Sequence, residues 1–290
     1  MRTSRHVLHR TALTCALAAL AVGAAACSDG GAAPPHPGRT HRPAASRPAA
    51  APTEPPTLAP GPAGLTPVFT SAPRARGRTV ALTFDADMTA DEGARAASGE
   101  HFDNPPLIAA LRSLRVPATV FMTGRWAEQY PAQARDIGAD PLFEVANHSY
   151  SHYAFTGDCY GLPTVAPGRM RADVERAFAA FRAAGVAHVV PYFRFPGGCY
   201  DRRALRALAP AAVTAVQWSV VSGDAFATDA GAVTRQVLDG VRPGSVVVLH
   251  CTRSAAPTTE RVVRAVVPAL RAKGFRFVRV SALLGAAGRA

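Results

Sequence analysis

The chain has only one lysine, Lys273, among its 290 residues, and aromatic residues make up only 7% of it. Arginine therefore carries nearly all of the positive charge, and the net charge is +12. A nucleic-acid-binding surface typically has a run of basic residues interleaved with aromatic ones. The sequence has no such run, so we expect no nucleic-acid partner. The excess of positive charge fits either attraction to an anionic cell envelope or an ordinary solvated surface.

The chain also lacks an apolar run that is comfortably long enough to span a membrane. Arg2, Arg5 and Arg10 precede an uncharged, mostly apolar run over 11–26 that ends in small residues directly before Cys27. This organisation is typical of an export signal. It resembles a bacterial lipoprotein signal, so we expect 1–27 to be a signal segment with a lipidated Cys27. The alternative is a plain secretory signal, and in either case the protein is exported, as a lipoprotein on the outer face of the cytoplasmic membrane or in secreted form.

Large apolar side chains are scarce over residues 28–77. Of the 25 prolines, 12 fall between Ser28 and Pro73, among Ala, Gly, Thr, Ser and Arg. Such a segment buries too little apolar surface to offset the entropy cost of ordering the chain. We therefore predict a disordered Pro/Ala-rich linker over 28–77. Residues 78–290 are ample for a single α/β core.

The first predicted strand ends in two acids. Residues 79–84 alternate in a β-prone run, and Asp85 and Asp87 follow at its end. Barrel enzymes keep catalytic groups at this end of a strand, and residues two apart share a face, so both carboxylates can reach one site. Turn formation is the other interpretation, because Asp commonly opens loops.

Two histidines four residues apart follow the third predicted strand, over 141–146. His148 and His152 belong to the run Asn-His-Ser-Tyr-Ser-His over 147–152. On one helical turn, or on a loop curled like one, their imidazoles can face one zinc-like ion. Two unrelated surface histidines are the alternative.

Three later motifs follow further predicted strands. Arg194 opens the run Arg-Phe-Pro-Gly-Gly, whose glycines allow backbone amides to approach a ligand, and the arginine can keep a carboxylate ionised. Trp218 lies at the end of the predicted strand over 213–219 and Asp224 follows that strand, and His250 comes directly after the strand over 245–249. A histidine at a strand end is placed to titrate near neutral pH in a cleft.

In this order the motifs resemble the polysaccharide deacetylases of carbohydrate esterase family four, the NodB-homology domain, over about residues 78–284. The correspondence runs through Thr83-Phe84-Asp85, His148-Ser149-x-x-His152, Arg194-x-Pro196-x-Gly198, Trp218 with Asp224, and Leu249-His250. The resemblance implies an α/β fold, a distorted (β/α) barrel with fewer than eight strands, and a catalytic domain over 78–290. Beyond the strands already named, we expect strands over 117–123, 189–193 and 275–280, and helices over 106–115, 126–137 and 259–273.

The resemblance further implies a metal-dependent hydrolase that removes N- or O-linked acetyl groups from a polysaccharide. Asp87, His148 and His152 would bind a divalent metal, with Zn²⁺ favoured over Co²⁺ or Mn²⁺. Asp85 would be the general base, held by Arg194, and His250 the acid, oriented by Asp224. The amide of Gly197 would stabilise the oxyanion, and Trp218 would contact substrate.

The chain departs from the family pattern at the first motif. Ala86 occupies the usual metal-ligand aspartate position and Asp87 the usual glycine position. Either Asp87 replaces the missing ligand, which we favour, or the metal rests on two histidines and water. In the fourth motif, Val221 replaces an acid and Ala225 replaces a tryptophan. In the third motif, Gly197 replaces an aromatic residue. These changes would reshape the substrate groove.

The implied partner is an acetylated glycan, and peptidoglycan, chitooligosaccharide and xylan all fit. We expect the enzyme to be a monomer. Two other functions stay open: a degenerate, lipid-anchored carbohydrate-binding module, and a metal-dependent amidase or esterase for a small substrate. Among Cys159, Cys199 and Cys251, we favour a disulfide between the first two, because each follows a motif assigned to the site, although the sequence does not fix the pairing.

Overall fold

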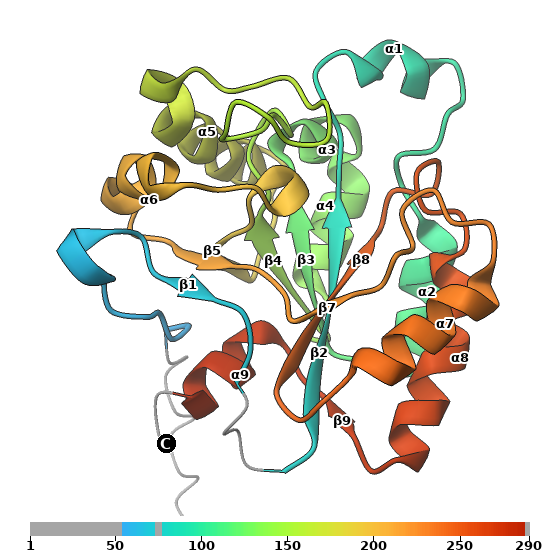
Figure 1. Cartoon of the computed structure of the whole chain (residues 1–290). Helices are drawn as coiled ribbons and strands as arrows, with labels where there is room; N and C mark the ends of the chain where they lie inside the picture. Colours follow the sequence, from blue (N-terminus) through green and yellow to red (C-terminus); the bar gives the residue numbers. More distant parts are fainter. Residues whose placement is uncertain (1–53, 73–76, 288–290) are drawn as a thin grey trace, which may run out of the picture. The chain divides into compact units, whose positions relative to one another are not determined.

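The computed structural model describes residues 54–72 and 77–287 (Figure 1). The strands in these residues are β1 (Val68–Phe69), β2 (Thr79–Ala86), β3 (Ala118–Met122), β4 (Phe143–Asn147), β5 (Val189–Phe193), β6 (Thr214–Val216), β7 (Val220–Val221), β8 (Ser245–His250) and β9 (Arg276–Phe277). The α-helices are α1 (Glu92–Ala97), α2 (Pro105–Ser113), α3 (Gly124–Gln129), α4 (Pro131–Ala139), α5 (Met170–Ala183), α6 (Arg202–Leu208), α7 (Ala230–Gly240), α8 (Thr259–Ala272) and α9 (Val280–Ala287).

The strands form one parallel sheet in the order β1-β6-β5-β4-β3-β2-β8-β7, with β9 also paired to β2. Its two edges approach each other, because Ser71 bridges Ser245 and the Ala72 amide donates to the Gly244 carbonyl at 2.8 Å. The distorted α/β barrel is confirmed. It contains more strands than the fewer than eight that we expected, because β1 and β7 have two residues each and leave almost no periodic signal.

Of three apolar clusters in the described residues, two lie on opposite faces of the central strands. Val80, Leu82 and Phe84 of β2 face outward into a cluster shared with the surrounding helices. Ala81 faces inward, where it packs with Phe121 and other apolar side chains of the barrel interior. This alternation places the side chain of Asp85 on the inner face, at the carboxyl end of the strand.

Part of the predicted linker belongs to the fold. Phe69 of β1 is buried in the barrel interior, and β1 pairs with β6 in parallel. The Leu58 amide donates to the Thr214 hydroxyl at 3.1 Å, and the Tyr192 hydroxyl donates to the Pro56 carbonyl at 2.8 Å. Disorder was therefore the wrong prediction for 54–72, where one short apolar stretch is hidden in a Pro-rich composition. The predicted signal segment and Cys27 lie outside the described residues.

Two further element predictions differ from the structure. The helix predicted over 126–137 is two helices, α3 and α4, because Pro131 begins a new helix after Tyr130. The strand predicted over 275–280 is limited to β9, and Val280 begins α9, whose apolar face covers the barrel interior.

Replacing Phe69 tests whether this segment is part of the folded core. We expect Phe69→Ala to lower the free energy of unfolding by about 3 kcal/mol, because it leaves a cavity in the barrel interior. The neighbouring Thr70 is exposed, so Thr70→Ala is the matched control. Equal denaturant midpoints for the two variants would show that 54–72 contributes no more than a tether.

Candidate active site

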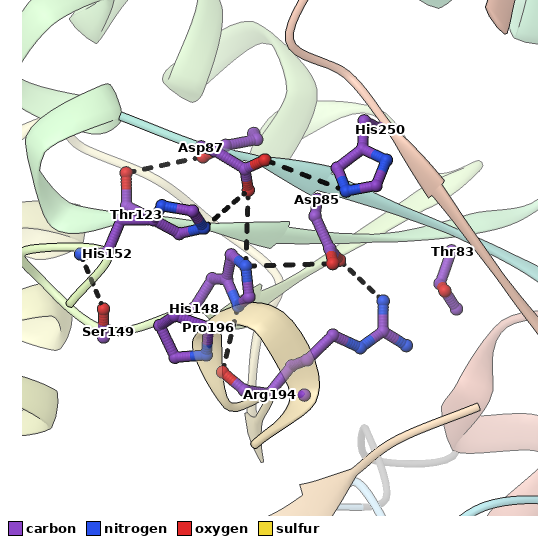
Figure 2. A network of polar contacts seen from close by, with 12 residues as sticks. Thr83, Asp85, Asp87, Thr123, His148, Ser149, His152, Arg194, Pro196 and His250 are labelled. Atoms are coloured by element: carbon purple, nitrogen blue, oxygen red, sulfur yellow. Dashed lines mark hydrogen bonds and ion pairs between the residues drawn. The ribbon is translucent and has the colours of Figure 1, made fainter. Parts of the chain in front are cut away.

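A cavity of about 600 Å³ opens at the carboxyl ends of the central strands. Its polar lining includes Asp85, Asp87, His148, His152 and His250. The strand register explains this meeting, because Asp85 on β2 lies opposite His250 on β8. Figure 2 shows Asp87 among the three imidazoles, and Asp85 between His148 and the guanidinium of Arg194. Every residue that the sequence assigned to catalysis or metal binding therefore lies in one cluster.

Asp85 has a fixed cationic partner within the chain. Its Oδ1 accepts a hydrogen bond from Nη1 of Arg194 at 2.6 Å, and both side chains are buried. The guanidinium stacks 3.8 Å from the centroid of Phe121 and donates to the Val216 carbonyl at 3.1 Å. Burial lowers the pKa of Arg194, and the Asp85 charge opposes this. The arginine thus fixes the orientation of Asp85, whose Oδ2 lies 3.7 Å from Nε2 of His148.

Asp87 has no such partner. Its Oδ1 is buried without a hydrogen bond and lies 3.3 Å from Nε2 of His148 and 3.5 Å from Nε2 of His152. Burial raises the pKa of this carboxyl, but the facing histidines outweigh it and the pKa lies below its usual range. Ala86 instead faces the outer core. Of the two carboxylates near the first motif, Asp87 is the one that faces both imidazoles.

The two histidines lie on a loop, which was one of the two geometries that the spacing allowed. The Asn147 carboxamide accepts from the Ser149 amide at 2.8 Å, and the Ser149 hydroxyl accepts from the His152 amide at 2.9 Å. Ser149 and His152 adopt left-handed conformations, with φ of 68° and 57°. These turns bring the two rings to a centroid distance of 5.0 Å.

The tautomer of His148 and the lowered pKa of His152 fit a metal site. Burial lowers the pKa of His148, but the charges of Asp85 and Asp87 outweigh burial and raise this pKa. Nδ1 of His148 lies 2.9 Å from the Arg194 carbonyl, which only accepts, so this nitrogen carries the hydrogen and Nε2 faces Asp87 with its lone pair in the neutral ring. Burial lowers the pKa of His152 to about 4, which keeps its ring neutral. One ligand atom each from Asp87, His148 and His152 lies within 4.8 Å of the others. A buried carboxylate oxygen without a donor, faced by two imidazoles, suits a divalent cation.

His250 is paired with Asp224 on the far side of Asp87. Nδ1 of His250 donates to Oδ1 of Asp224 at 2.8 Å, and Oδ2 accepts from the His250 amide and the Thr259 hydroxyl. Burial lowers the pKa of His250, but the hydrogen bond and charge of Asp224, with Asp87 and Asp85, raise it to about 10. Nε2 lies 4.0 Å from Oδ2 of Asp87, so the ring faces the centre of the site.

Comparison with known proteins places this site in a family. The family model described as "Polysaccharide deacetylase" matches residues 72–216, half of the chain. The chain belongs to the polysaccharide deacetylase family. Asp224 and His250 lie beyond the matched region; the fold brings His250 into the same cavity as the matched motifs, with Asp224 buried behind it and hydrogen-bonded to it.

Individual relatives agree with this assignment. A chitooligosaccharide deacetylase of Bradyrhizobium is 30% identical over 209 residues, which cover 68% of this chain and 87% of the relative. The Bc1960 peptidoglycan N-acetylglucosamine deacetylase has the same fold, with a TM-score of 0.62 and 24% identity over 75% of this chain and 92% of that one. A CE4 family pseudoenzyme from Bacillus anthracis also shares the fold, with a TM-score of 0.59 and 20% identity over 78% and 70% of the two chains. The fold alone therefore does not establish catalysis.

The third and fourth motifs of this deacetylase family member form one wall of the cavity. Gly197 and Trp218 both line it, as the sequence indicated. Gly197 has φ of 64°, and a Cβ there would lie 2.5 Å from Sγ of Cys159. The predicted disulfide between Cys159 and Cys199 is present, with a Cα–Cα distance of 6.0 Å. Cys251 is buried and free.

Several residues that shape the site were not identified from the sequence. Asp173 accepts from the Tyr150 amide at 2.8 Å and holds the histidine loop, and Thr252 accepts from the Asp87 amide at 2.9 Å. Glu92 and Arg95 of α1 line the cavity, so the insertion between β2 and α2 forms part of its rim. Asn147 offered one sequence signal, because an Asn at a strand end commonly caps the turn that follows.

The pairing of His250 with Asp224 predicts a measurable titration. With chelator present, we expect Asp224→Asn to lower the pKa of His250 from about 10 toward the usual 6.5, because a hydrogen-bonded negative charge is lost. In the wild type, the stability from this raised pKa is complete below about pH 6.5 and is lost as the pH rises toward 10. NMR of the imidazole tests this, with the exposed Asp239→Asn as control. An unchanged His250 titration in Asp224→Asn would contradict the assignment.

Proposed function

We propose that this protein removes acetyl groups from an acetylated glycan with the help of a divalent cation. The observation that carries the proposal is the buried Oδ1 of Asp87, which has no hydrogen-bond donor and faces Nε2 of both His148 and His152. Family membership supports deacetylation. The chitooligosaccharide deacetylase relative favours acetylated amino sugars over xylan as substrate.

Asp87, His148 and His152 would hold the cation. Two imidazole nitrogens and one carboxylate oxygen are a ligand set that Zn²⁺ accepts with a position left open for substrate, and Co²⁺ accepts similar ligands. A cation bound there would polarise the acetyl carbonyl and favour ionisation of a neighbouring water. In this proposal Asp87 replaces the aspartate that the family carries at the position of Ala86.

The remaining residues would move the protons. Asp85, held by Arg194 at 2.6 Å, accepts a proton from the attacking water as its oxygen bonds to the acetyl carbon. His250, whose raised pKa keeps it protonated at neutral pH, donates a proton to the departing nitrogen as the carbon–nitrogen bond breaks. The products are acetate and a free amine. The Gly197 amide is the proposed donor to the oxyanion, and Trp218 contacts the substrate.

A non-catalytic carbohydrate-binding module is the second candidate, because a CE4 family pseudoenzyme shares this fold. The replacement at Ala86 favours it, and the placement of Asp87 opposes it. Acetate release from a chitin oligomer that stops with chelator and returns with Zn²⁺ would exclude it. Comparing the rate of acetate release from the chitin oligomer with the rate from small acetamides and esters shows whether the enzyme acts on a polymer or on a small substrate.

Replacing Asp87 tests the proposed ligand set. We expect Asp87→Ala to lower Zn²⁺ affinity and kcat/KM for a chitin oligomer by at least about 100-fold, because the sole anionic ligand is lost. The exposed Asp91 on the rim is the matched control, as Asp91→Asn. Calorimetry with Zn²⁺ and an acetate-release assay provide the two readouts. Wild-type Zn²⁺ affinity in Asp87→Ala would mean that the metal rests on the histidines alone.

We further propose that the protein acts outside the cell from a lipid anchor at Cys27. The charged and apolar N-terminal pattern supports this proposal. In the described part of the chain, no helix has the length and apolarity to cross a membrane. In cells labelled with palmitate, we expect the wild type to carry label and to sediment with membranes, whereas Cys27→Ser does neither. An unlabelled wild type found only in the medium would support a plain secretory signal.

A further inference from the structure

Two exposed aromatic side chains lie at the rim of the active-site cavity. Tyr160 is 88% exposed and Phe226 is 83% exposed, and both line the cavity that contains Asp87 and His250. An aromatic side chain stabilises a fold when it is buried. These two contribute little burial, so their presence at this rim requires another explanation.

Both residues also have unfavourable backbone conformations. Tyr160 has φ of 51° and Phe226 has φ of 59°, in the left-handed region where the Cβ of a bulky residue crowds the backbone. Such conformations cluster at functional sites, where the surrounding structure maintains them. Here the shared feature of the two residues is that they line one cavity.

Local contacts fix each position. Tyr160 follows Cys159, which is bonded to Cys199, and the Leu162 amide closes the turn on the Cys159 carbonyl at 3.0 Å. A Cβ at Gly197 would lie 3.3 Å from Cδ2 of Tyr160, so the ring lies beside the glycine that replaces the family's aromatic residue.

The Phe226 loop is fixed separately. Its amide donates to the Ala255 carbonyl at 2.6 Å, and the next amide, of Ala227, donates to the Asp224 carbonyl at 3.1 Å. Phe226 directly follows Ala225, where the family has a tryptophan. Tyr160 and Phe226 therefore each lie next to a position at which the family has an aromatic residue and this chain has a small one.

The sheet order places the reacting centre between the two aromatic residues. Tyr160 lies on the loop after β4 and Phe226 on the loop after β7, whereas Asp87 and His250 follow β2 and end β8, which lie between them in the sheet. Four strand spacings of about 4.8 Å separate β4 from β7 along the sheet, as an upper bound for a curved sheet. The two rings therefore lie on opposite sides of the reacting centre, where different sugar units can reach them.

Resting on the function proposed above, we propose that Tyr160 and Phe226 are stacking platforms for sugar rings on either side of the unit that loses its acetyl group. The apolar C–H face of a pyranose complements the face of an aromatic ring. The ligand class is therefore an extended β-linked glycan of several amino sugars, and a single sugar contacts at most one platform.

Glycine substitutions separate binding from folding. Tyr160→Gly and Phe226→Gly remove a ring and relieve the left-handed backbone. We expect each to weaken binding of a β-1,4-linked glucosamine hexamer roughly five- to tenfold. The Tm should stay unchanged or rise by up to about 3 °C. Trp at either position should restore binding, and glucosamine itself should bind equally weakly to all variants.

The measurement is calorimetry and thermal melting of the zinc-loaded full chain, with Tyr200→Ala as the control at an exposed aromatic that does not line the cavity. The hexamer is the deacetylated product, so turnover does not alter it. Unchanged hexamer affinity in both glycine variants, no binding by the wild type, or weaker binding that comes with a fall in Tm would each overturn the proposal. A wild type that binds the hexamer through both rings but releases no acetate from chitin would refute the proposed function and leave this inference standing.

Discussion

The site depends on an asymmetry between two carboxylates that lie two residues apart at the end of β2. Asp85 is neutralised within the chain by the buried guanidinium of Arg194, whereas Asp87 has an orphaned oxygen and faces imidazoles only. A buried carboxylate oxygen without a hydrogen-bond donor is costly, so folding alone does not explain why Asp87 points inward. A cation shared with His148 and His152 would complete the neutralisation, and Asp85, held apart by Arg194, would remain available as a base.

The parallel sheet makes this arrangement possible. Its register sets Asp85 opposite His250, and Met122 opposite Asn147, so that groups far apart in the sequence meet at one edge. The histidine loop then depends on local hydrogen bonds to Asn147 and Ser149. The strands thus hold Asp85 and His250 in rigid positions, while short loops supply Asp87, the two metal-facing histidines and the rim.

Much of this was predictable, because strong periodicity and ordered motifs are local signals. The alternation before Asp85 predicted β2, and the shared face of residues two apart predicted that Asp87 would reach the site. The strand β1 escaped prediction because two residues in a Pro-rich segment gain their order from pairing with β6, which is a long-range effect. Tyr160 and Phe226 are single aromatic residues in loops, and only the fold shows that they share a cavity.

The central claim is that Asp87, and not two histidines with water, completes the metal site. The most direct measurement is anomalous diffraction at the zinc edge from a Zn²⁺-soaked crystal of the full chain. We expect one strong peak within about 2.0–2.2 Å of Oδ1 of Asp87 and of Nε2 of His148 and His152. A peak bound to the two imidazoles with Asp87 turned away, or no peak at this site, would contradict it.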